Sequence, residues 1–405
     1  MTAAANDPAD LARHWTLDPQ VTYLNHGSFG ACPLPVLEAQ QALRDQLERE
    51  PARFFTREAP VLLARARETV AEFVGASTEG FAFVPNVTTA INSVLRSIPL
   101  EPGDELLVTD HEYNASRNIL EYVAAEHDCR VVVATIPFPL DGPRAVLDAV
   151  LARVGPRTRL ALIDHVTSQT AIVMPIAALI RELESRGVDV LVDGAHAPGM
   201  VELDVGALNP AYYAANCHKW LCGPKGVGFL WAREDKRKQV RPAVISHGAN
   251  APVDLAGRYR MEFDWMGTDD PTAALALPEA IRFMGSLLPG GWASLRSRNR
   301  ALVLEGRRLV ADALGVGLPC PDEMIGSMAS LSVPETARFP PTNVTSALEL
   351  DPLHEALFRD YAIEAPVITC PAHPGRLLRI SAQAYNTPSD YQRLAEALRE
   401  LLGTG

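Results

Sequence analysis

Between residues 81 and 193 the chain repeats one unit, in which a short apolar run is followed by a longer segment with helical periodicity. The runs are rich in Val, Ile and Leu and do not alternate between polar and apolar residues, which is typical of strands buried on both faces of a sheet. The pattern predicts strands at residues 81–84, 105–109, 130–135, 160–164 and 188–193, and helices at residues 88–98, 116–127, 144–154 and 176–186. This alternation favours an α/β fold with a large, doubly wound, mostly parallel sheet.

Beyond residue 267 the pattern becomes helix-heavy. Helical segments at residues 272–288, 292–314, 352–361 and 388–402 accompany strand candidates at residues 328–333 and 377–381. A chain of 405 residues is also too long for one small core. We therefore expect a large α/β domain over residues 20–266, and a smaller α+β domain made of residues 267–405 with an N-terminal arm, residues 1–19. Two further helices, at residues 34–50 and 58–74, are expected to be separated at Pro51.

The charge and composition exclude several classes of partner. The net charge of −12 opposes binding to nucleic acid or to an anionic membrane. There is no apolar run of about 18 residues, as a transmembrane helix requires. The N-terminal residues are polar and acidic, unlike a signal peptide. Six cysteines spread thinly over the chain fit a reducing compartment, so we expect a cytoplasmic protein that acts on a small molecule.

Polar residues follow the predicted strands where each strand ends, which is the edge at which open α/β sheets bind ligands. Thr88 and Thr89 open a helix after the first strand, where backbone amides and hydroxyls could hold a phosphate. Simple N-capping of that helix by Thr88 is equally compatible with the pattern. After the next strand, His111 and Tyr113 could each cover a flat ring.

Asp193 ends a buried strand and is followed by Gly and Ala. A carboxylate there is costly to bury without a cation, and a protonated pyridine nitrogen would be a suitable partner. The alternative is that Asp193 caps the following turn.

Lys219 stands out because the chain uses lysine so rarely: of 37 basic residues only four are lysines, at positions 219, 225, 236 and 238. A desolvated lysine can lose its proton and bond to an aldehyde, whereas arginine cannot. An ordinary loop lysine is the alternative. Cys217 and Cys222 flank His218, but no second Cys/His pair with ligand spacing accompanies them, so we expect no metal. A phosphate seat, a ring cover, a buried Asp and this lysine together match the needs of pyridoxal phosphate.

Three motifs occur in order: Thr88-Thr89, Asp193-Gly194-Ala195-His196 and His218-Lys219-Trp220. In these motifs the chain resembles the class V aminotransferase family of fold type I pyridoxal phosphate enzymes. The resemblance extends over nearly the whole chain, from residues 24–30 to residues 379–387. The closest likeness is to the isopenicillin N epimerase-like branch, which is related to cysteine desulfurases and cysteine-conjugate C–S lyases.

The resemblance implies a role for each matching residue. Lys219 would bond to the cofactor aldehyde, and Asp193 would pair with its ring nitrogen. Ala195 and Tyr113, or His111 in its place, would pack on the ring, and His196 would reach its hydroxyl. The phosphate would be held by Thr88, Thr89, Asn216 and His218. Ser168 stands where desulfurases carry a cofactor-touching Asn.

Arg379 would bind the substrate carboxylate, with Asn25, His26 and Arg53 lining the substrate side. Gly267-Thr268 resembles the segment that reaches the partner's phosphate in a homodimer with active sites at the interface.

The resemblance leaves the reaction open. Desulfurases carry a nucleophilic Cys on a mobile loop, whereas the nearest candidate here, Cys370, lies in a short Pro-rich segment. We expect β-elimination from an S-substituted cysteine in specialised or thiol metabolism, such as antibiotic biosynthesis, with Tyr113 near the leaving sulfur. Epimerisation, decarboxylation or oxidative deamination, and desulfuration are the alternatives. The non-enzymatic alternative is a regulator or scaffold that retains the cofactor-binding domain. Such a protein would be expected to lack Lys219 or Asp193, or to carry a DNA-binding segment, and the sequence shows neither feature.

Overall fold

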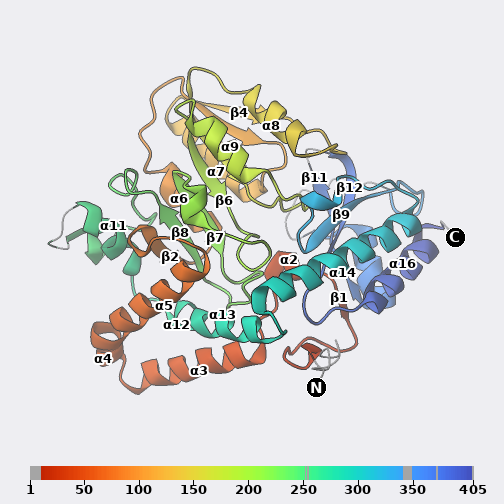
Figure 1. Ribbon diagram of the computed structural model, residues 1–405, viewed down its shortest axis with the longest axis horizontal. Helices are drawn as coiled ribbons and strands as arrows, with labels where there is room; N and C mark the ends of the chain where they lie inside the picture. Colours follow the sequence, from red (N-terminus) through yellow and green to blue (C-terminus); the bar gives the residue numbers. More distant parts are fainter. Residues whose placement is uncertain (1–10, 251, 253–254, 341–348, 371–372, 404–405) are drawn as a thin grey trace.

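The computed structural model describes residues 11–250, 252, 255–340, 349–370 and 373–403. Its centre is a seven-stranded sheet in the order β2-β8-β7-β6-β5-β3-β4 (Figure 1). The strands are β2 (Phe81–Val84), β3 (Glu105–Thr109), β4 (Arg130–Ala134), β5 (Thr158–Asp164), β6 (Asp189–Asp193), β7 (Tyr212–Asn216) and β8 (Gly228–Ala232). Strands β3 to β7 are parallel, and β8 runs antiparallel to both of its neighbours. The predicted fold class is confirmed, and the carboxyl ends of six strands meet at one edge.

Helices cover both faces of this sheet, as the non-alternating strands require. One core contains Ile91 of α6 (Val87–Leu95), Ile119 of α7 (Asn114–Glu126) and Tyr259 of α11 (Leu255–Asp264). The other contains Val146 of α8 (Pro143–Leu151) and Leu179 of α9 (Ile176–Glu184). A short helix, α10 (Val205–Leu208), follows β6.

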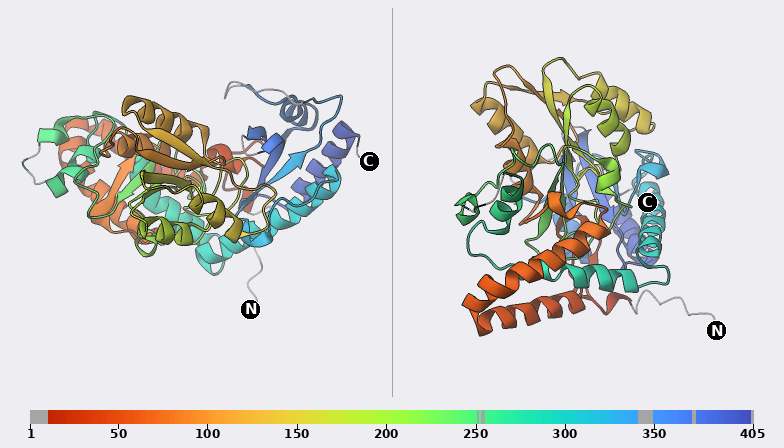
Figure 2. Two further views of the ribbon diagram at one scale, coloured as in Figure 1. Left: turned by 90° about the horizontal axis from the view of Figure 1, so that it is seen from above. Right: turned by 60° about the vertical axis from the view of Figure 1, so that its left-hand side comes forward.

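A second sheet lies beside the first and has the order β11-β12-β9, all antiparallel. It comprises β9 (Met328–Val333), β11 (Val367–Cys370) and β12 (His373–Ser381). The long helix α14 (Gly291–Leu314) and the helix α16 (Pro388–Leu402) pack together along it, and Figure 2 shows them at the same end of the molecule. Helix α15 (Pro352–Tyr361) leads into the short strand β10 (Ile363–Glu364).

The N-terminal segment joins this second part of the molecule. Strand β1 (Thr22–Tyr23) pairs in parallel with β10, and helix α2 (His26–Phe29) follows it. Residues 24–30, which carry part of the family resemblance, therefore follow a strand end and contain a helical turn. The boundaries of the two expected domains stay a prediction.

Two paired layers of helices complete the structure. Helices α3 (Leu34–Arg49) and α5 (Ala59–Phe73) pack against α12 (Thr272–Leu275) and α13 (Leu277–Ser286). Between α3 and α5 the chain stays helical through α4 (Pro51–Arg53) and a π-helical turn (Phe54–Glu58), because Pro51 takes the first helical position, where no amide donor is needed. Short 3₁₀ turns occur at Thr78–Gly80, His247–Asn250 and Asp322–Met324. None of the described helices has the length and apolarity needed to cross a membrane.

Candidate active site

Lys219 lies just after β7, at the sheet edge where the parallel strands end. Its Nζ atom is 3.1 Å from Nε2 of His196. Burial and the nearby Arg379 guanidinium lower the pKa of Lys219 to about 8, against the opposing influence of Asp193 and Asp164. The side chain can therefore be a free amine close to neutral pH, which an ordinary loop lysine is not.

His196 is held between Lys219 and the indole of Trp220. Trp220 Nε1 donates to His196 Nδ1 at 3.2 Å, on the side of the ring opposite Lys219. Burial, followed by the positive charges of Lys219 and Arg379, keeps the pKa of His196 well below its usual range. The imidazole is therefore neutral. Trp220 was part of a quoted motif but had no predicted role.

Asp193 ends β6 and is buried. Its Oδ1 accepts the backbone amide of Ala195 at 2.9 Å, and its Oδ2 accepts the hydroxyl of Ser116 at 3.2 Å. Burial raises the pKa of Asp193, although these two contacts and Lys219 act in the opposite direction. The amide contact shows that Asp193 does cap its own turn, and the remaining penalty still favours a cationic ligand. Next to it, a side chain on Gly194 would collide with the ring of Tyr213, so only glycine fits.

Two further carboxyl groups lie against Asp193, and the sequence analysis gave neither a role. One oxygen each of Glu112, Asp164 and Asp193 lies within 4.8 Å of the others. Burial and mutual repulsion raise the pKa values of Glu112 and Asp164 well above the usual range. Asp164 is the last residue of β5 and lies directly opposite Asp193 in the β5–β6 pairing. Its position at the end of a predicted strand, as for Asp193, is the feature from which it could have been found.

The predicted phosphate seat lies at the N-terminus of α6. Asn86 caps this helix by accepting the amide of Thr89 at 2.9 Å, so the alternative in which Thr88 is the cap is wrong. Thr88 is exposed in the first turn. Asn216 Oδ1 accepts the amide of Val87 at 3.0 Å, which ties the end of β7 to the helix start. These residues thus lie next to one another at the sheet edge.

His218 completes that corner. Its Nδ1 donates to the carbonyl of Val227 at 2.9 Å, and burial lowers its pKa to about 4. Cys217, one residue before it, lies in the hydrophobic core, and the Cys222 thiol contacts His26 at 3.7 Å.

The two candidate ring covers have different surroundings. His111 is fully buried, with Nδ1 2.7 Å from the hydroxyl of Thr170 and its ring edge-on to Phe138. Tyr113, immediately before α7, is 45% exposed and close enough to Arg379 to influence its pKa. Tyr113 is thus the one with an open face, and its place over a cofactor ring stays a prediction.

Arg379 reaches the site from β12 of the second sheet. One guanidinium nitrogen donates to the carbonyl and hydroxyl of Ser168 at 2.7 and 3.3 Å. The other donates to the Ser28 hydroxyl at 2.6 Å and to Asn25 Oδ1 at 3.4 Å. Burial lowers the pKa of Arg379 to about 10. All of these acceptors are neutral, and no carboxylate in the described ranges pairs with this guanidinium, so it suits a ligand carboxylate.

Three predicted residues lie elsewhere. His26 was expected on the substrate side, but it is fully buried behind the lysine, with Nε2 3.1 Å from the Lys219 carbonyl and Nδ1 2.8 Å from the Tyr385 hydroxyl. Burial lowers its pKa to about 3. Arg53 points outward and pairs with Glu58 at 2.7 Å. Thr268 is exposed, and its role toward a partner subunit stays a prediction. The Cys370 side chain lies outside the described residues.

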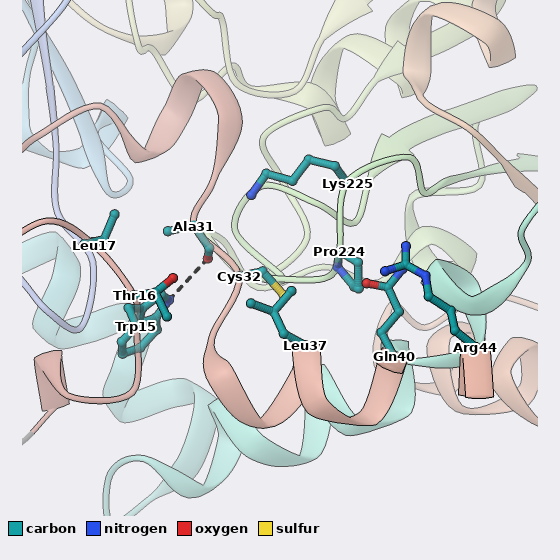
Figure 3. A pocket seen from close by; sticks show the side chains of 10 residues that line it. All are labelled: Trp15, Thr16, Leu17, Ala31, Cys32, Leu37, Gln40, Arg44, Pro224 and Lys225. Carbon is teal, nitrogen blue, oxygen red and sulfur yellow. Dashed lines mark hydrogen bonds between the residues drawn. The ribbon is translucent and has the colours of Figure 1, made fainter. Parts of the chain in front are cut away.

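A cavity of about 420 Å³ lies between the N-terminal segment and the loop that contains Pro224 and Lys225 (Figure 3). Its walls come from the segment around Trp15, from Ala31 and Cys32, from α3, and from Pro224 and Lys225. Lys225 donates to the Gly30 carbonyl, and Trp15 Nε1 donates to Ala31 at 3.2 Å. The lining does not include Lys219, so this cavity is separate from the site described above.

Comparison with known families and proteins gives a consistent result. The model of the family described as aminotransferase class V matches residues 32–307. Isopenicillin N epimerase of Streptomyces clavuligerus is 38% identical over 401 residues, which cover 96% of each chain. L-cysteine desulfhydrase of Arabidopsis thaliana is 28% identical over 425 residues, covering 97% of this chain and 90% of that protein.

Solved structures share the fold over nearly the whole chain. The cysteine desulfurase CsdA of Escherichia coli superposes with a TM-score of 0.76 at 24% identity, covering 98% of this chain and 99% of that chain. The cystine C–S lyase C-DES, in complex with cysteine persulfide, superposes with a TM-score of 0.75 at 23% identity, covering 94% and 97% of the two chains.

Proposed function

The chain belongs to the class V aminotransferase family and is a pyridoxal phosphate enzyme, and we propose that it cleaves the C–S bond of an S-substituted cysteine by β-elimination. The overall reaction converts the cysteine conjugate and water into pyruvate, ammonia and a free thiol. An amino acid of this kind carries the carboxylate that the Arg379 guanidinium suits.

The residues at the sheet edge fit the cofactor. Asp193 is a buried carboxylate that forms no ion pair among the residues that the structure describes, and it would hold the protonated ring nitrogen. The start of α6, with Thr88, Asn216 and His218 nearby, would hold the phosphate. When bound, pyridoxal phosphate withdraws electrons from the substrate Cα and so makes its proton removable.

Lys219 and Arg379 then divide the work. Arg379 holds the substrate carboxylate and so orients the Cα–H bond. Lys219 Nζ takes that proton, which its lowered pKa of about 8 permits near neutral pH. The electron pair left on Cα forms a double bond to Cβ as the thiolate departs. Tyr113, which is 45% exposed and near Arg379, would donate a hydrogen bond to the departing sulfur.

The observation that carries the proposal is the combination of a buried base, Lys219, with a guanidinium, Arg379, that suits a carboxylate. β-Elimination needs only this base, whereas epimerisation also needs an acid on the opposite side of Cα. His26 and His111 are buried against other protein groups, so Tyr113 would have to be that acid.

Epimerisation is the second candidate, and a specific observation favours it: isopenicillin N epimerase is 38% identical to this chain over 96% of both lengths. In that reaction Lys219 would remove the Cα proton and the Tyr113 hydroxyl would return one to the other face. We also propose a homodimer, in which Thr268 approaches the partner's phosphate seat.

The two candidates differ in their products. Purified protein with added pyridoxal phosphate is incubated with cysteine, cystine and S-alkyl cysteines, and pyruvate and thiol are quantified together. We expect equimolar pyruvate and thiol, and no product from Lys219→Ala. Loss of optical rotation in a single-enantiomer substrate, without thiol release, would overturn the elimination and support the epimerase. Epimerisation of the substrate Cα by both Lys219→Ala and Tyr113→Phe would contradict the roles given to the two residues.

A further inference from the structure

His196 lies between Trp220 and Lys219, with its Nδ1 3.2 Å from Trp220 Nε1 and its Nε2 3.1 Å from Lys219 Nζ. We infer that Trp220 is a positioning residue: by donating its indole N–H to Nδ1 of His196, it fixes the imidazole proton on Nε2 and so favours the free-amine form of Lys219. The significance of this for catalysis rests on the proposed function, in which Lys219 bonds to the cofactor, but the protonation itself does not.

The argument follows from counting donors and acceptors. An indole N–H can only donate, so Nδ1 of His196, 3.2 Å away, must accept. A neutral imidazole has one donor and one acceptor, so its proton then sits on Nε2. Nε2 lies 3.1 Å from Lys219 Nζ, and two donors cannot share one hydrogen bond. Lys219 must therefore supply a lone pair, which the amine has and the ammonium lacks.

Burial, and after it the neighbouring basic groups, lowers the pKa of His196 and keeps the imidazole neutral. The charged and titratable groups that act on His196 are Lys219, Arg379 and His26, and all of them are basic. An imidazolium, which would donate from both nitrogens, is therefore disfavoured. Around Lys219 itself, Arg379 from β12 opposes the ammonium, whereas Asp193 of β6 and Asp164 of β5 favour it. The Nε2–H bond adds to the influence of Arg379 and helps to lower the pKa of Lys219.

Tryptophan is suited to this task in a way that other apolar residues are not. Its side chain is 1% exposed and packs on His26, with the ring centroids 4.9 Å apart. Phenylalanine could occupy most of that space but has no N–H. With Nδ1 no longer bound to a donor, the imidazole proton could move there, and Nε2 could then accept from the Lys219 ammonium.

The test measures the lysine directly in the cofactor-free protein. The chain has only four lysines, so lysine labelled with ¹³C at Cε gives four signals, and a Lys219→Arg variant identifies the one sought. In the unmodified protein we expect this signal to titrate near pH 8. In Trp220→Phe we expect it to titrate higher, leaving about tenfold less free amine at pH 7, the size of effect that one hydrogen bond produces.

Two controls separate this role from packing. Trp231→Phe removes another buried indole, one that donates to Ser77 at 3.1 Å, and should leave the Lys219 titration unchanged. In a His196→Leu background, Trp220→Phe should have no further effect, because the indole acts through the imidazole. An equal shift with and without His196 would overturn the inference.

A second measurement needs no Trp220 variant and so does not depend on its folding. In protein labelled with ¹⁵N-histidine, the His196 signals, identified by their loss in His196→Leu, should be those of the Nε2–H tautomer. An Nδ1–H tautomer would also overturn the inference. Because neither measurement uses cofactor or substrate, both can succeed even if the proposed elimination is wrong.

Discussion

Strand β12 carries two buried arginines whose surroundings differ completely. Arg376 and Arg379 are three positions apart, so their side chains leave opposite faces of the strand. Arg376 is paired through one guanidinium nitrogen with both carboxylate oxygens of Asp351, at 3.0 and 3.2 Å, and also donates to the Phe339 carbonyl. Within the described part of the chain, Arg379 donates to neutral oxygens alone, those of Ser168, Ser28 and Asn25.

The difference separates a structural charge from a functional one. A buried charge is costly unless a charge of opposite sign accompanies it. Arg376 has its counter-ion within the chain, so nothing further needs to bind. Arg379 is fixed in place by four hydrogen bonds, and no carboxylate of the described residues pairs with its charge. A ligand carboxylate would supply the match.

The largest effect is expected on the structural side. Arg376→Met leaves Asp351 buried without its cation, which should destabilise the protein by about 3–5 kcal/mol. Urea unfolding of the cofactor-free protein measures this. The double variant Arg376→Met, Asp351→Leu should recover most of the loss, because both charges are then gone. If Arg376→Met were as stable as the original protein, the Arg376–Asp351 ion pair would not be what stabilises the buried Asp351 charge.

On the functional side, we expect Arg379→Gln to lower kcat/KM about 100- to 1000-fold, since the substrate carboxylate loses a buried charged partner. Its unfolding midpoint should stay unchanged or rise, because an unmatched buried charge has been removed. Steady-state kinetics and thermal unfolding of the same preparation provide both numbers. A variant that unfolds readily yet retains its kcat/KM would reverse the roles of the two arginines.

A third prediction uses pH. Lys219 loses its proton near pH 8 in the folded protein and near 10.5 when unfolded, so the unfolded state binds more protons between these values. Stability of the cofactor-free protein should therefore receive a positive contribution from Lys219 as pH rises from about 8 to 10.5. Arg379→Gln removes a nearby positive charge and should move the lower edge of this window up by about one pH unit.

This contribution is isolated by subtracting the stability–pH curve of Lys219→Met from that of the unmodified lysine, in each background. The conservative comparison is Arg376→Lys, which should leave the window where it is. If both arginine variants moved this pH window equally, the two faces of β12 would not differ in their electrostatic effect on Lys219.

The smallest effect should come from the group one step behind Arg379. Glu364 accepts from Asn25 Nδ2 at 2.7 Å and lies 3.1 Å from His354 Nε2, and Asn25 in turn accepts from Arg379. Glu364→Gln keeps the shape and changes the charge, so we expect KM to change about threefold with kcat unaltered. A loss as large as that of Arg379→Gln would show that the guanidinium has a counter-ion after all.

The sequence predicted the large sheet well because buried parallel strands have a distinctive composition. All five strands expected between residues 81 and 193 are present, as β2 to β6. Local signals also predicted the helices of the C-terminal part, with one exception: residues 272–288 form two helices, interrupted at Ala276. Strands β1 and β10 are two residues each and were missed, since so short a pairing leaves no periodicity to detect.

Two candidate site residues could be singled out from the sequence because their residue type is unusual for the position. Lys219 and Asp193 stood out for that reason and Arg379 through the family resemblance, and the structure brings Arg379 and Asp193 close enough to act on the lysine. His26 was misplaced because a motif shows which residues belong together but not which way a side chain points. Trp220 and Glu112 were passed over because an apolar residue after a lysine and an acid in a loop are unremarkable until their neighbours are known.

The pairing of the chain's early and late segments has a consequence for biosynthesis. Ser28 and Asn25 are 351 and 354 positions away from the arginine that they hold. At about 5–20 residues per second, a ribosome needs roughly 20–70 s to cover that distance. The sheet that carries Lys219 can form within this interval, before β12 has been synthesised and can contact the segment around Ser28. A nascent chain can therefore have Lys219 in place before Ser28 and Asn25 are able to contact Arg379.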